Sequence, residues 1–512
     1  MSVITIIGLG PGAPGQLTVE ARELLDGLAA LDVRTTVHPT VAALPASLAV
    51  RSFDHLYASA SEFGAIYATI AATLIERARA GEAVWYAVPG HPLVAEATTR
   101  HLLAGAKAAG IPVRIVAGLS FVEPVCTALG LDPLEHGLQL VDALDLVPPA
   151  PRAAEGADRA WSELHGAGPY VAPLSPFPLQ PARPALLCQV YSAPIASEAK
   201  LSLLERYPAQ HPVTIVTSAG MADERVAEVP LHELDHQQGF DHLTCVYVPA
   251  LPIHEDVRGF DAVQWVMEKL AGPFGCPWDR EQTHKTLQPF LLEEAHEVLE
   301  ALNQEDYDAV SEELGDVLLQ VVFHAELGRQ AGLFDMGDIH AALTNKLIRR
   351  HPHIFGDLPV SGSGEVLRNW EAIKAAERAE KGKTDRPSVL DGIPASLPAL
   401  PTAQTLGRKA AKVGFDWPEV AGVWDKIAEE LEELRQAPPE EREGELGDLL
   451  FAITNLARWL EIDAETALRQ TNAKFRRRFQ AIEAGARAQG REVSDLSLDE
   501  AEALWQAAKR SG

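Results

Sequence analysis

The sequence predicts a multidomain protein in which an α/β domain precedes a duplicated all-α domain. Three observations support this prediction. The chain of 512 residues is too long for one ordinary hydrophobic core. Short apolar runs typical of buried strands occur through the first half, and after about residue 255 long helical patterns replace them. The helical pattern then occurs twice in the same order.

The first domain is predicted over residues 1–250. Apolar runs such as "VITIIG", "AVWYAVPG" and "PVTIVTSAG" are bounded by Gly and Pro, and amphipathic stretches such as "LTVEARELLDGLAAL" lie between them. This alternation is typical of an α/β domain. We expect the remaining boundaries at residues 251–381 for a first helical repeat, 382–401 for a Pro/Gly-rich linker and 402–512 for a second helical repeat.

The helical half repeats itself in sequence. "LLEEAHEVLEAL" corresponds to "IAEELEELRQA", "EELGDVLLQVVFHA" to "GELGDLLFAITNLA", and "TNKLIRR" to "NAKFRRR". Trp370 with Lys374 corresponds to Trp505 with Lys509, each in a W-x-x-x-K pattern. Four matches in one order indicate an internal duplication.

Paired carboxylates are the chemical signature of both repeats. Residues three apart share one face of a helix, so each pair projects together. The first repeat carries Glu294, Glu297, Glu313 and Asp316, and the second carries Glu430, Glu433, Glu445 and Asp448.

The acids could form an ordinary solvated face or a metal site. Apolar residues such as Leu314, Val317 and Leu318 surround the second pair of the first repeat. A partly buried acid cluster requires a cation or protonation. Carboxylates without interleaved His or Cys suit Mg²⁺ or Mn²⁺ rather than zinc. We therefore favour a metal site for metal-assisted hydrolysis of a phosphate ester or anhydride.

Composition limits the partners. The formal net charge of -28 argues against nonspecific binding to nucleic acid or to an anionic membrane. We find no apolar run of spanning length and no basic region before the first strand. The four cysteines are far apart, which favours a reducing compartment. We expect a cytoplasmic protein.

The helical half resembles the MazG family of nucleoside triphosphate pyrophosphohydrolases. The motifs "GCPWDREQTHKTLQPFLLEEAHEVLEAL", "EELGDVLLQVVFHAELG", "RRHPHIFGD" and "VGFDW…EELEEL…GELGDLLFAITNLARWL" carry the resemblance, which covers about residues 258–512. It implies an all-α fold, a homodimer, Mg²⁺, and cleavage of canonical or noncanonical nucleoside triphosphates to nucleoside monophosphate and pyrophosphate.

The resemblance also implies residue roles. The eight acids named above match the metal ligands, and Glu430, Glu433, Glu445 and Asp448, together with Lys474, are the expected catalytic set. Lys474 and Arg478 would pair with phosphate. Trp505 would stack on a base, although a core or interface Trp is an equal alternative. Asn455 stands where the first repeat has Phe323, so we expect the second repeat to be the better nucleotide site.

A glycine loop follows the first strand. Gly8, Gly10 and Ala13 satisfy G-x-G-x-x-A, and Asp32 lies near the position of a ribose-binding acid. However, Pro11 interrupts the loop, and the helical pattern begins only after Thr18, a candidate N-cap. A dinucleotide site is therefore disfavoured.

The same loop resembles the tetrapyrrole (corrin/porphyrin) methylase family. "YAVPGHPLVAEA", "AGLSFVEPVCTALGLDP" and "YSAPIASEAKLSLLERY" fit later blocks of that family, over about residues 3–225. The resemblance implies S-adenosylmethionine bound between two α/β lobes. The implied cofactor contacts are Gly8, Gly10, Pro11, Gly12, Gly90, His91, Pro92, Ser120 and Ala219.

Two departures from that family leave the acceptor open. His91 replaces a more typical Asp, and "YSAPIAS" lacks the Arg that often follows that block. The leading hypothesis is thus Mg²⁺-dependent hydrolysis of nucleoside triphosphates. The alternatives are methyl transfer at the first domain, and a noncatalytic helical half that serves in nucleotide sensing or dimerisation.

Overall fold

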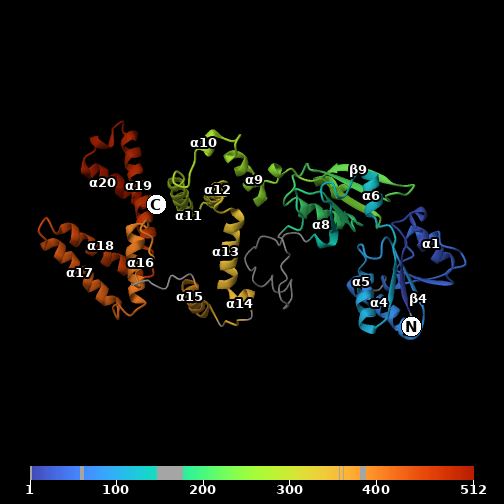
Figure 1. The fold of residues 1–512 in the computed structure, drawn as a ribbon. Helices are drawn as coiled ribbons and strands as arrows, with labels where there is room; N and C mark the ends of the chain where they lie inside the picture. The colour runs from blue at the N-terminus through green and yellow to red at the C-terminus, as the bar shows by residue number, and fades with distance from the viewer. Residues whose placement is uncertain are drawn as a thin grey trace. The chain divides into compact units, whose positions relative to one another are not determined.

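The computed structural model describes residues 3–57, 63–146, 177–356, 358–360, 362–380 and 388–511 (Figure 1). The chain divides into two compact units, Met1–Gln282 and Thr283–Gly512, and each is described by itself. The first unit is α/β and the second is helical, as the sequence predicts. The predicted linker 382–401 lies partly outside the described residues.

The first sheet is parallel, with strand order β3-β2-β4-β1-β5. Its strands are β1 Ile4–Gly8, β2 Ala30–Val33, β3 Ala49–Ser52, β4 Val84–Val88 and β5 Val113–Val116. Its helices are α1 Val19–Asp26, α2 Pro39–Ala42, α3 Asp54–Tyr57, α4 Phe63–Arg79, α5 Ala97–Ala109 and α6 Val122–Leu129. Thr18 accepts a hydrogen bond from the Ala21 amide, which confirms the predicted N-cap of α1.

Strand β1 explains why a continuous apolar run is needed at the centre of this sheet. Ile4 and Ile6 pack on one face together with residues of α4 and α5, whereas Ile7 packs on the other face with residues of α1 (Figure 1). A strand that is covered on both faces has no polar side, so "ITIIG" reads as an apolar run rather than as an alternation.

The second sheet is mixed, with strand order β6-β7-β10-β8-β9. Its strands are β6 Gln139–Asp142, β7 Ala185–Cys188, β8 Pro212–Thr217, β9 Arg225–Pro230 and β10 Thr244–Val248. Helix α8 Ala193–Leu203 packs its buried residues into the core of this lobe. The helices α9 Phe260–Ala271 and α10 Pro277–Arg280 end the unit. Short 3₁₀ turns lie at Pro14–Gln16, Ala143–Asp145, Leu231–His236 and Ile253–Glu255.

The second unit contains the two repeats. The first comprises α11 Gln288–Gln304, α12 Tyr307–Gln330, α13 Met336–Arg350, α14 Pro352–Phe355 and α15 Ser363–Glu380. The second comprises α16 Ala399–Ala411, α17 Val420–Gln436, α18 Arg442–Trp459, α19 Ala464–Ala488, a 3₁₀ turn at Val493–Asp495 and α20 Leu498–Ser511. The packed pair α11 and α12 corresponds to the packed pair α17 and α18, as the duplicated motifs require.

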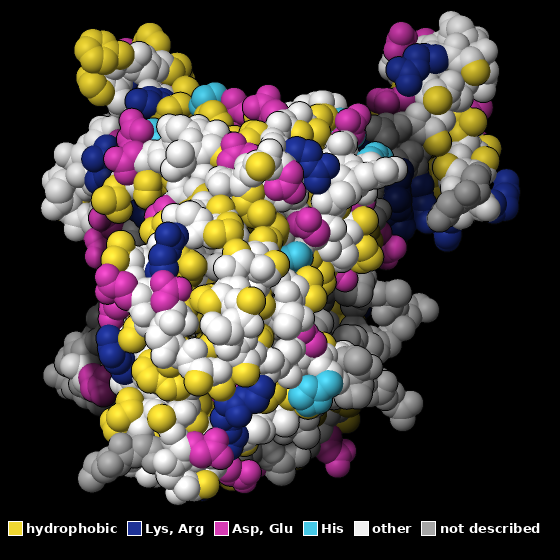
Figure 2. All heavy atoms as spheres, turned by 90° about the vertical axis from the view of Figure 1, so that its right-hand side faces the viewer, with side chains coloured by type: hydrophobic (Ala, Val, Ile, Leu, Met, Phe, Trp, Pro, Cys, Tyr) yellow, Lys and Arg dark blue, Asp and Glu magenta, His cyan; other side chains and the backbone are white. Residues whose placement is uncertain are grey.

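The described surface carries charges of both signs. Figure 2 shows Lys and Arg side chains scattered among acidic and hydrophobic side chains on the face of the first unit. Among the described residues, no helix is both long enough and apolar enough to cross a membrane.

A partly buried ion pair joins α13 to α15 in the first repeat. Arg350 donates to both carboxylate oxygens of Glu377, at 3.1 and 2.6 Å, and Arg349 also pairs with this carboxylate at 2.8 Å. The hydrogen bond from Arg350 and the charge of Arg349 lower the pKa of Glu377 to about 2. Because the folded pKa lies below the ordinary value of 4.5, the pair stabilises the fold above that value.

We therefore expect the stability contribution of Glu377 to be lost as the pH falls from about 4.5 to about 2. The denaturant midpoint of wild type should fall more steeply over this interval than that of Glu377→Gln. Glu380→Gln is the matched control, because Glu380 is exposed and lies 3.9 Å from Arg349. Equal slopes for wild type and Glu377→Gln would contradict the expectation.

Candidate functional sites

The helical pair α11 and α12 gathers the acids of the first repeat. Carboxylate oxygens of Glu294, Glu313 and Asp316 all lie within 4.8 Å of one another, and the three side chains are half-buried. Glu297 is exposed and lies beside this group, close enough to hydrogen-bond to Glu294. The i, i+3 spacing on two facing helices thus places these four acids in one cluster.

The pair α17 and α18 repeats the arrangement. Carboxylate oxygens of Glu430, Glu445 and Asp448 also lie within 4.8 Å of one another. Glu430 is buried, Glu445 is half-buried and Asp448 is exposed. Glu433 is exposed one helical turn from Glu430. Sequence spacing therefore predicted acids that the fold brings together in both repeats.

The chemistry of the clusters fits a hard divalent cation. Burial raises the pKa of Glu294 and of Glu313, and the charges of Glu297 and Asp316 raise it further. Burial and the charge of Glu430 likewise raise the pKa of Glu433, although Lys426 opposes this shift. Carboxylates that repel one another at partly buried positions gain from a cation between them, and an all-oxygen set suits Mg²⁺ or Mn²⁺.

The predicted phosphate- and base-contacting residues lie on α19 and α20. The Arg478 guanidinium lies over the Trp505 ring, with 5.6 Å from its central carbon to the ring centroid. Phe475 packs against the same ring at a centroid distance of 5.2 Å, and Trp505 is half-buried. Lys474 is exposed one residue before Phe475. No hydrogen bond or ion pair among the described residues joins this group to the acids of α17 and α18.

Asn455 lies inside the second repeat. It is buried, and its Oδ1 accepts a 2.8 Å hydrogen bond from Arg458 Nε. Arg458 in turn pairs with Asp416 at 2.7 Å. Phe323, at the corresponding position of the first repeat, is also buried. The predicted contact of Asn455 with nucleotide remains a prediction, and because Arg458 occupies Oδ1, the Nδ2 donor is the atom that would make it.

In the first unit, three loops at the carboxyl ends of β1, β4 and β5 meet. Gly10 and Gly90 pair through two backbone hydrogen bonds of 3.3 and 2.7 Å, and both have φ near +70° (70° and 67°). A Cβ on Gly8 would lie 2.6 Å from the Gly118 nitrogen and 2.7 Å from the Gly90 oxygen. Only glycine permits such close approach of backbones. The carboxyl edge of a parallel sheet is where α/β folds bind ligands.

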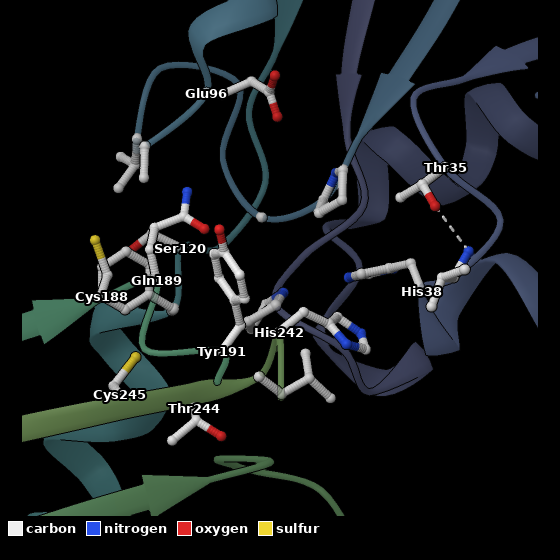
Figure 3. Close-up of a pocket in the computed structure, with 18 of the residues that line it drawn as sticks. Thr35, His38, Glu96, Ser120, Cys188, Gln189, Tyr191, His242, Thr244 and Cys245 are labelled. Atoms are coloured by element: carbon white, nitrogen blue, oxygen red, sulfur yellow. Dashed lines mark hydrogen bonds between the residues drawn. The ribbon is translucent and has the colours of Figure 1, made fainter. Parts of the chain in front are cut away.

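A cavity of about 570 Å³ opens beside these loops and is lined from both sheets (Figure 3). Pro11, Gly90, His91, Ser120 and Ala219 of the predicted cofactor set line it. Gly8, Gly10, Gly12 and Pro92 are not among the lining residues, and the glycines instead shape the loops. This volume is typical of a site for one drug-sized ligand.

Two predicted cofactor residues already have local partners. The Ser120 hydroxyl donates to Glu123 at 2.6 Å, and the Ser120 amide donates to the same oxygen at 2.9 Å. His91 Nδ1 accepts from the Leu93 amide at 3.1 Å. These contacts hold the second and third loops in shape.

The cavity is also lined by residues that the sequence analysis missed. His38 is buried at the cavity, and neither ring nitrogen forms a hydrogen bond of full geometry with the described residues, although the backbone of Gly10 and Pro11 lies near the ring. Burial, followed by the nearby His242 and Arg34, lowers the pKa of His38 to about 4, so the ring is neutral at neutral pH. Arg34 pairs with the buried Glu96 at 2.9 Å. Both His38 and Arg34 follow β2, and the carboxyl-edge rule that located the glycine loops would have located them as well.

Cys188 and Cys245 line another side of the cavity, away from His38 (Figure 3). Burial raises the pKa of Cys188 to about 12 and raises that of Cys245 as well. A thiol that stays protonated is a poor nucleophile. These cysteines therefore shape the cavity rather than supply a reactive thiolate.

Asp32, the alternative ribose-binding acid, has a structural role. It is buried and pairs with Arg51 and Arg77, each at 2.9 Å. It does not belong to the described lining of the cavity. This arrangement agrees with the sequence argument against a dinucleotide site.

The fold and the two sites define a two-part protein: a two-lobed α/β domain with a ligand cavity and a helical region with paired carboxylate clusters. Residues 3–235 match the family of tetrapyrrole (corrin/porphyrin) methylases, and residues 282–355 match the MazG nucleotide pyrophosphohydrolase domain.

Similar proteins cover both parts. The uncharacterized protein YabN of Bacillus subtilis is 41% identical over 99% of this chain and 98% of its own length. The nucleoside triphosphate pyrophosphohydrolase of Escherichia coli K12 is 48% identical over 49% of this chain and 97% of its own. The crystal structure of uroporphyrin-III C-methyltransferase from Thermus thermophilus is 23% identical, with a TM-score of 0.35 over 49% of this chain and 95% of its own.

The chain therefore belongs to the MazG family of nucleoside triphosphate pyrophosphohydrolases and carries a tetrapyrrole methylase domain before its MazG region.

Proposed function

We propose that the helical region is a nucleoside triphosphate pyrophosphohydrolase that depends on Mg²⁺ or Mn²⁺. The observation that carries this proposal is the convergence of three carboxylates from two facing helices in each repeat, with a fourth acid one helical turn away. The Escherichia coli relative, a nucleoside triphosphate pyrophosphohydrolase, supports the same reaction. The products are nucleoside monophosphate and pyrophosphate.

The side chains have distinct tasks in this proposal. Glu294, Glu297, Glu313 and Asp316 hold the cation in the first repeat, and Glu430, Glu433, Glu445 and Asp448 hold it in the second. A bound divalent cation would offset phosphate charge and lower the pKa of a bound water. Lys474 and Arg478 pair with phosphate oxygens, and Trp505 offers an aromatic face to the base.

We propose a house-cleaning role, in which noncanonical or excess nucleoside triphosphates are removed. The carboxylate clusters bind the phosphates through a cation, and the phosphates are common to all nucleotides. Selection of the base then depends on residues such as Trp505.

We also propose a homodimer. Leu431, Leu446 and Leu450 lie near the acids of the second repeat and are 40, 47 and 49% exposed. Two helical hairpins that pack as a four-helix arrangement would bury such residues. Burial would also strengthen the electrostatic interactions within the carboxylate cluster.

Pyrophosphate release from a panel of canonical and noncanonical nucleoside triphosphates tests the proposal. We expect release with Mg²⁺ or Mn²⁺ and none with a chelator. Nucleotide binding without turnover would instead support a sensing or dimerisation module.

The two repeats are expected to contribute unequally to turnover. Glu445→Ala should lower pyrophosphate release more than Glu313→Ala, because the second repeat has Asn455, which can hydrogen-bond to nucleotide, where the first has Phe323. Steady-state rates of the two variants at saturating Mg²⁺ measure this difference. Equal losses would refute the ordering.

A second activity, methyl transfer from S-adenosylmethionine, is favoured by the cavity beside the three glycine loops. Methyl transfer depends mainly on positioning of donor and acceptor. The cavity offers backbone groups of the loops together with the side chains of His38, Arg34 and Glu96. Binding of labelled S-adenosylmethionine to the full chain tests this activity, and absence of binding at millimolar cofactor would count against it.

A further inference from the structure

The two carboxylate clusters differ in one side chain that the proposed function does not use. Lys426 lies one helical turn before Glu430 on α17, and its Nζ is 2.8 Å from oxygens of both Glu429 and Glu430. The duplicated motifs align Lys426 with Phe290, four residues before Glu294 on α11. The second cluster therefore has the ammonium group of a lysine at the position where the first has an aromatic ring.

The first cluster lacks such compensation. Among the described residues, no Lys or Arg side chain forms an ion pair with Glu294, Glu297, Glu313 or Asp316. The repulsion among its acids is therefore not offset by a paired basic side chain of the described residues, which favours the binding of a cation from solution. The two sites thus share a set of ligands and differ in their charge before any metal binds.

An ammonium at this distance opposes a metal ion in two ways. It occupies one acceptor direction of a Glu430 oxygen, and it repels a second cation that approaches the same carboxylates. Glu430 is only 6% exposed while the Lys426 side chain is 35% exposed, so solvent screens this repulsion only in part. A triphosphate would remove the conflict, because its oxygens can accept hydrogen bonds from Lys426 Nζ and so release Glu430.

We propose that Lys426 makes the two sites unequal: the first binds a divalent cation without nucleotide, and the second binds its cation together with the triphosphate. This inference rests on the proposed metal sites. Lys426 would then be a positioning residue that couples cation binding to nucleotide binding in the second repeat.

Binding of Mn²⁺ to the full chain, followed by the electron paramagnetic resonance of free Mn²⁺, tests the proposal. Glu445→Ala/Asp448→Ala leaves only the first cluster, and Glu313→Ala/Asp316→Ala leaves only the second. We expect the second cluster alone to bind Mn²⁺ about tenfold more weakly than the first, or weaker still.

Reciprocal substitutions assign the difference to one position. In the variant that keeps only the second cluster (Glu313→Ala/Asp316→Ala), Lys426→Met should recover most of the affinity for Mn²⁺, whereas Lys426→Arg should leave the affinity weak. In the variant that keeps only the first cluster (Glu445→Ala/Asp448→Ala), Phe290→Lys should weaken Mn²⁺ binding by a similar factor. Phe290→Met is its matched control for loss of the ring, and far-UV circular dichroism verifies that each variant is folded.

A nucleotide analogue tests the coupling. A nucleoside triphosphate with a methylene bridge between the α- and β-phosphates should strengthen Mn²⁺ binding more in the second cluster than in the first. Lys426→Met should reduce that gain.

Equal Mn²⁺ affinities of the variants that keep one cluster each, or no change in affinity on Lys426→Met, would overturn the inference. The proposed metal sites themselves would still stand. If the nucleotide analogue increased Mn²⁺ affinity equally in both clusters, the proposed coupling would be overturned. Absence of bound Mn²⁺ in both backgrounds would overturn the proposed metal-dependent hydrolase as well, so the two failures are distinguishable.

Discussion

Replacing Asp316 and Asp448 together by Asn should lower pyrophosphate release by about a hundredfold to a thousandfold. Each substitution removes a negative charge from a carboxylate cluster while keeping the shape of the side chain. Metal assistance stabilises transition-state charge by several kcal/mol, which corresponds to a loss of this size. Pyrophosphate release at fixed nucleotide and Mg²⁺ measures the effect.

The matched control for this variant is Asp308→Asn/Asp425→Asn. These acids lie on α12 and α17, the helices that carry part of the two clusters, but neither belongs to a cluster. The control should retain activity close to wild type. If the control lost as much activity as the test variant, general charge rather than the clusters would explain the result.

Arg34→Met should destabilise the first unit by about 3 kcal/mol, because it leaves a buried charge on Glu96 without its partner. The Glu96 side chain is 2% exposed and that of Arg34 is 22% exposed, so we expect the lower end of the range for a broken buried pair. Hydrogen exchange of peptides from β1, β2 and β4, analysed by mass spectrometry, measures the local free energy of opening.

The double variant Arg34→Met/Glu96→Gln is the control for this prediction. Replacing both members of a buried ion pair is often close to neutral, because neither charge remains without a partner. Protection should therefore return toward the wild-type level. A double variant that is as unstable as Arg34→Met would show that the arginine acts through packing instead.

Local spacing made the carboxylate clusters predictable. The i, i+3 rule places Glu313 beside Asp316 on one helix without knowledge of the fold, and the duplication supplied the same pattern a second time. The i, i+4 rule would also have paired Lys426 with Glu430. The central strands β1 and β4 were equally predictable, because a strand buried on both faces is an uninterrupted apolar run, whereas the exposed edge strand β3 has no such run.

The remaining features of the sites depend on tertiary contacts and could not be predicted from the sequence. Arg34 and Glu96 are 62 residues apart, and only the neighbouring positions of β2 and β4 bring them together. Nor does the sequence show that Asn455 lies beneath Arg458, since an amide on an amphipathic helix is compatible with either face. Polar residues at the edge of a buried sheet and inside a helical pair acquire their partners only when the whole domain folds.

The contact of Gly8, Gly90 and Gly118 has a mechanical consequence. A Cβ on Gly118 would lie 2.5 Å from the Gly90 oxygen, so the three loops are in backbone contact and cannot slide past one another. They act as a fixed wall of the cavity. Differences in the width of the cavity therefore depend on its other lining segments, such as those at Tyr57, Gln189 and His242.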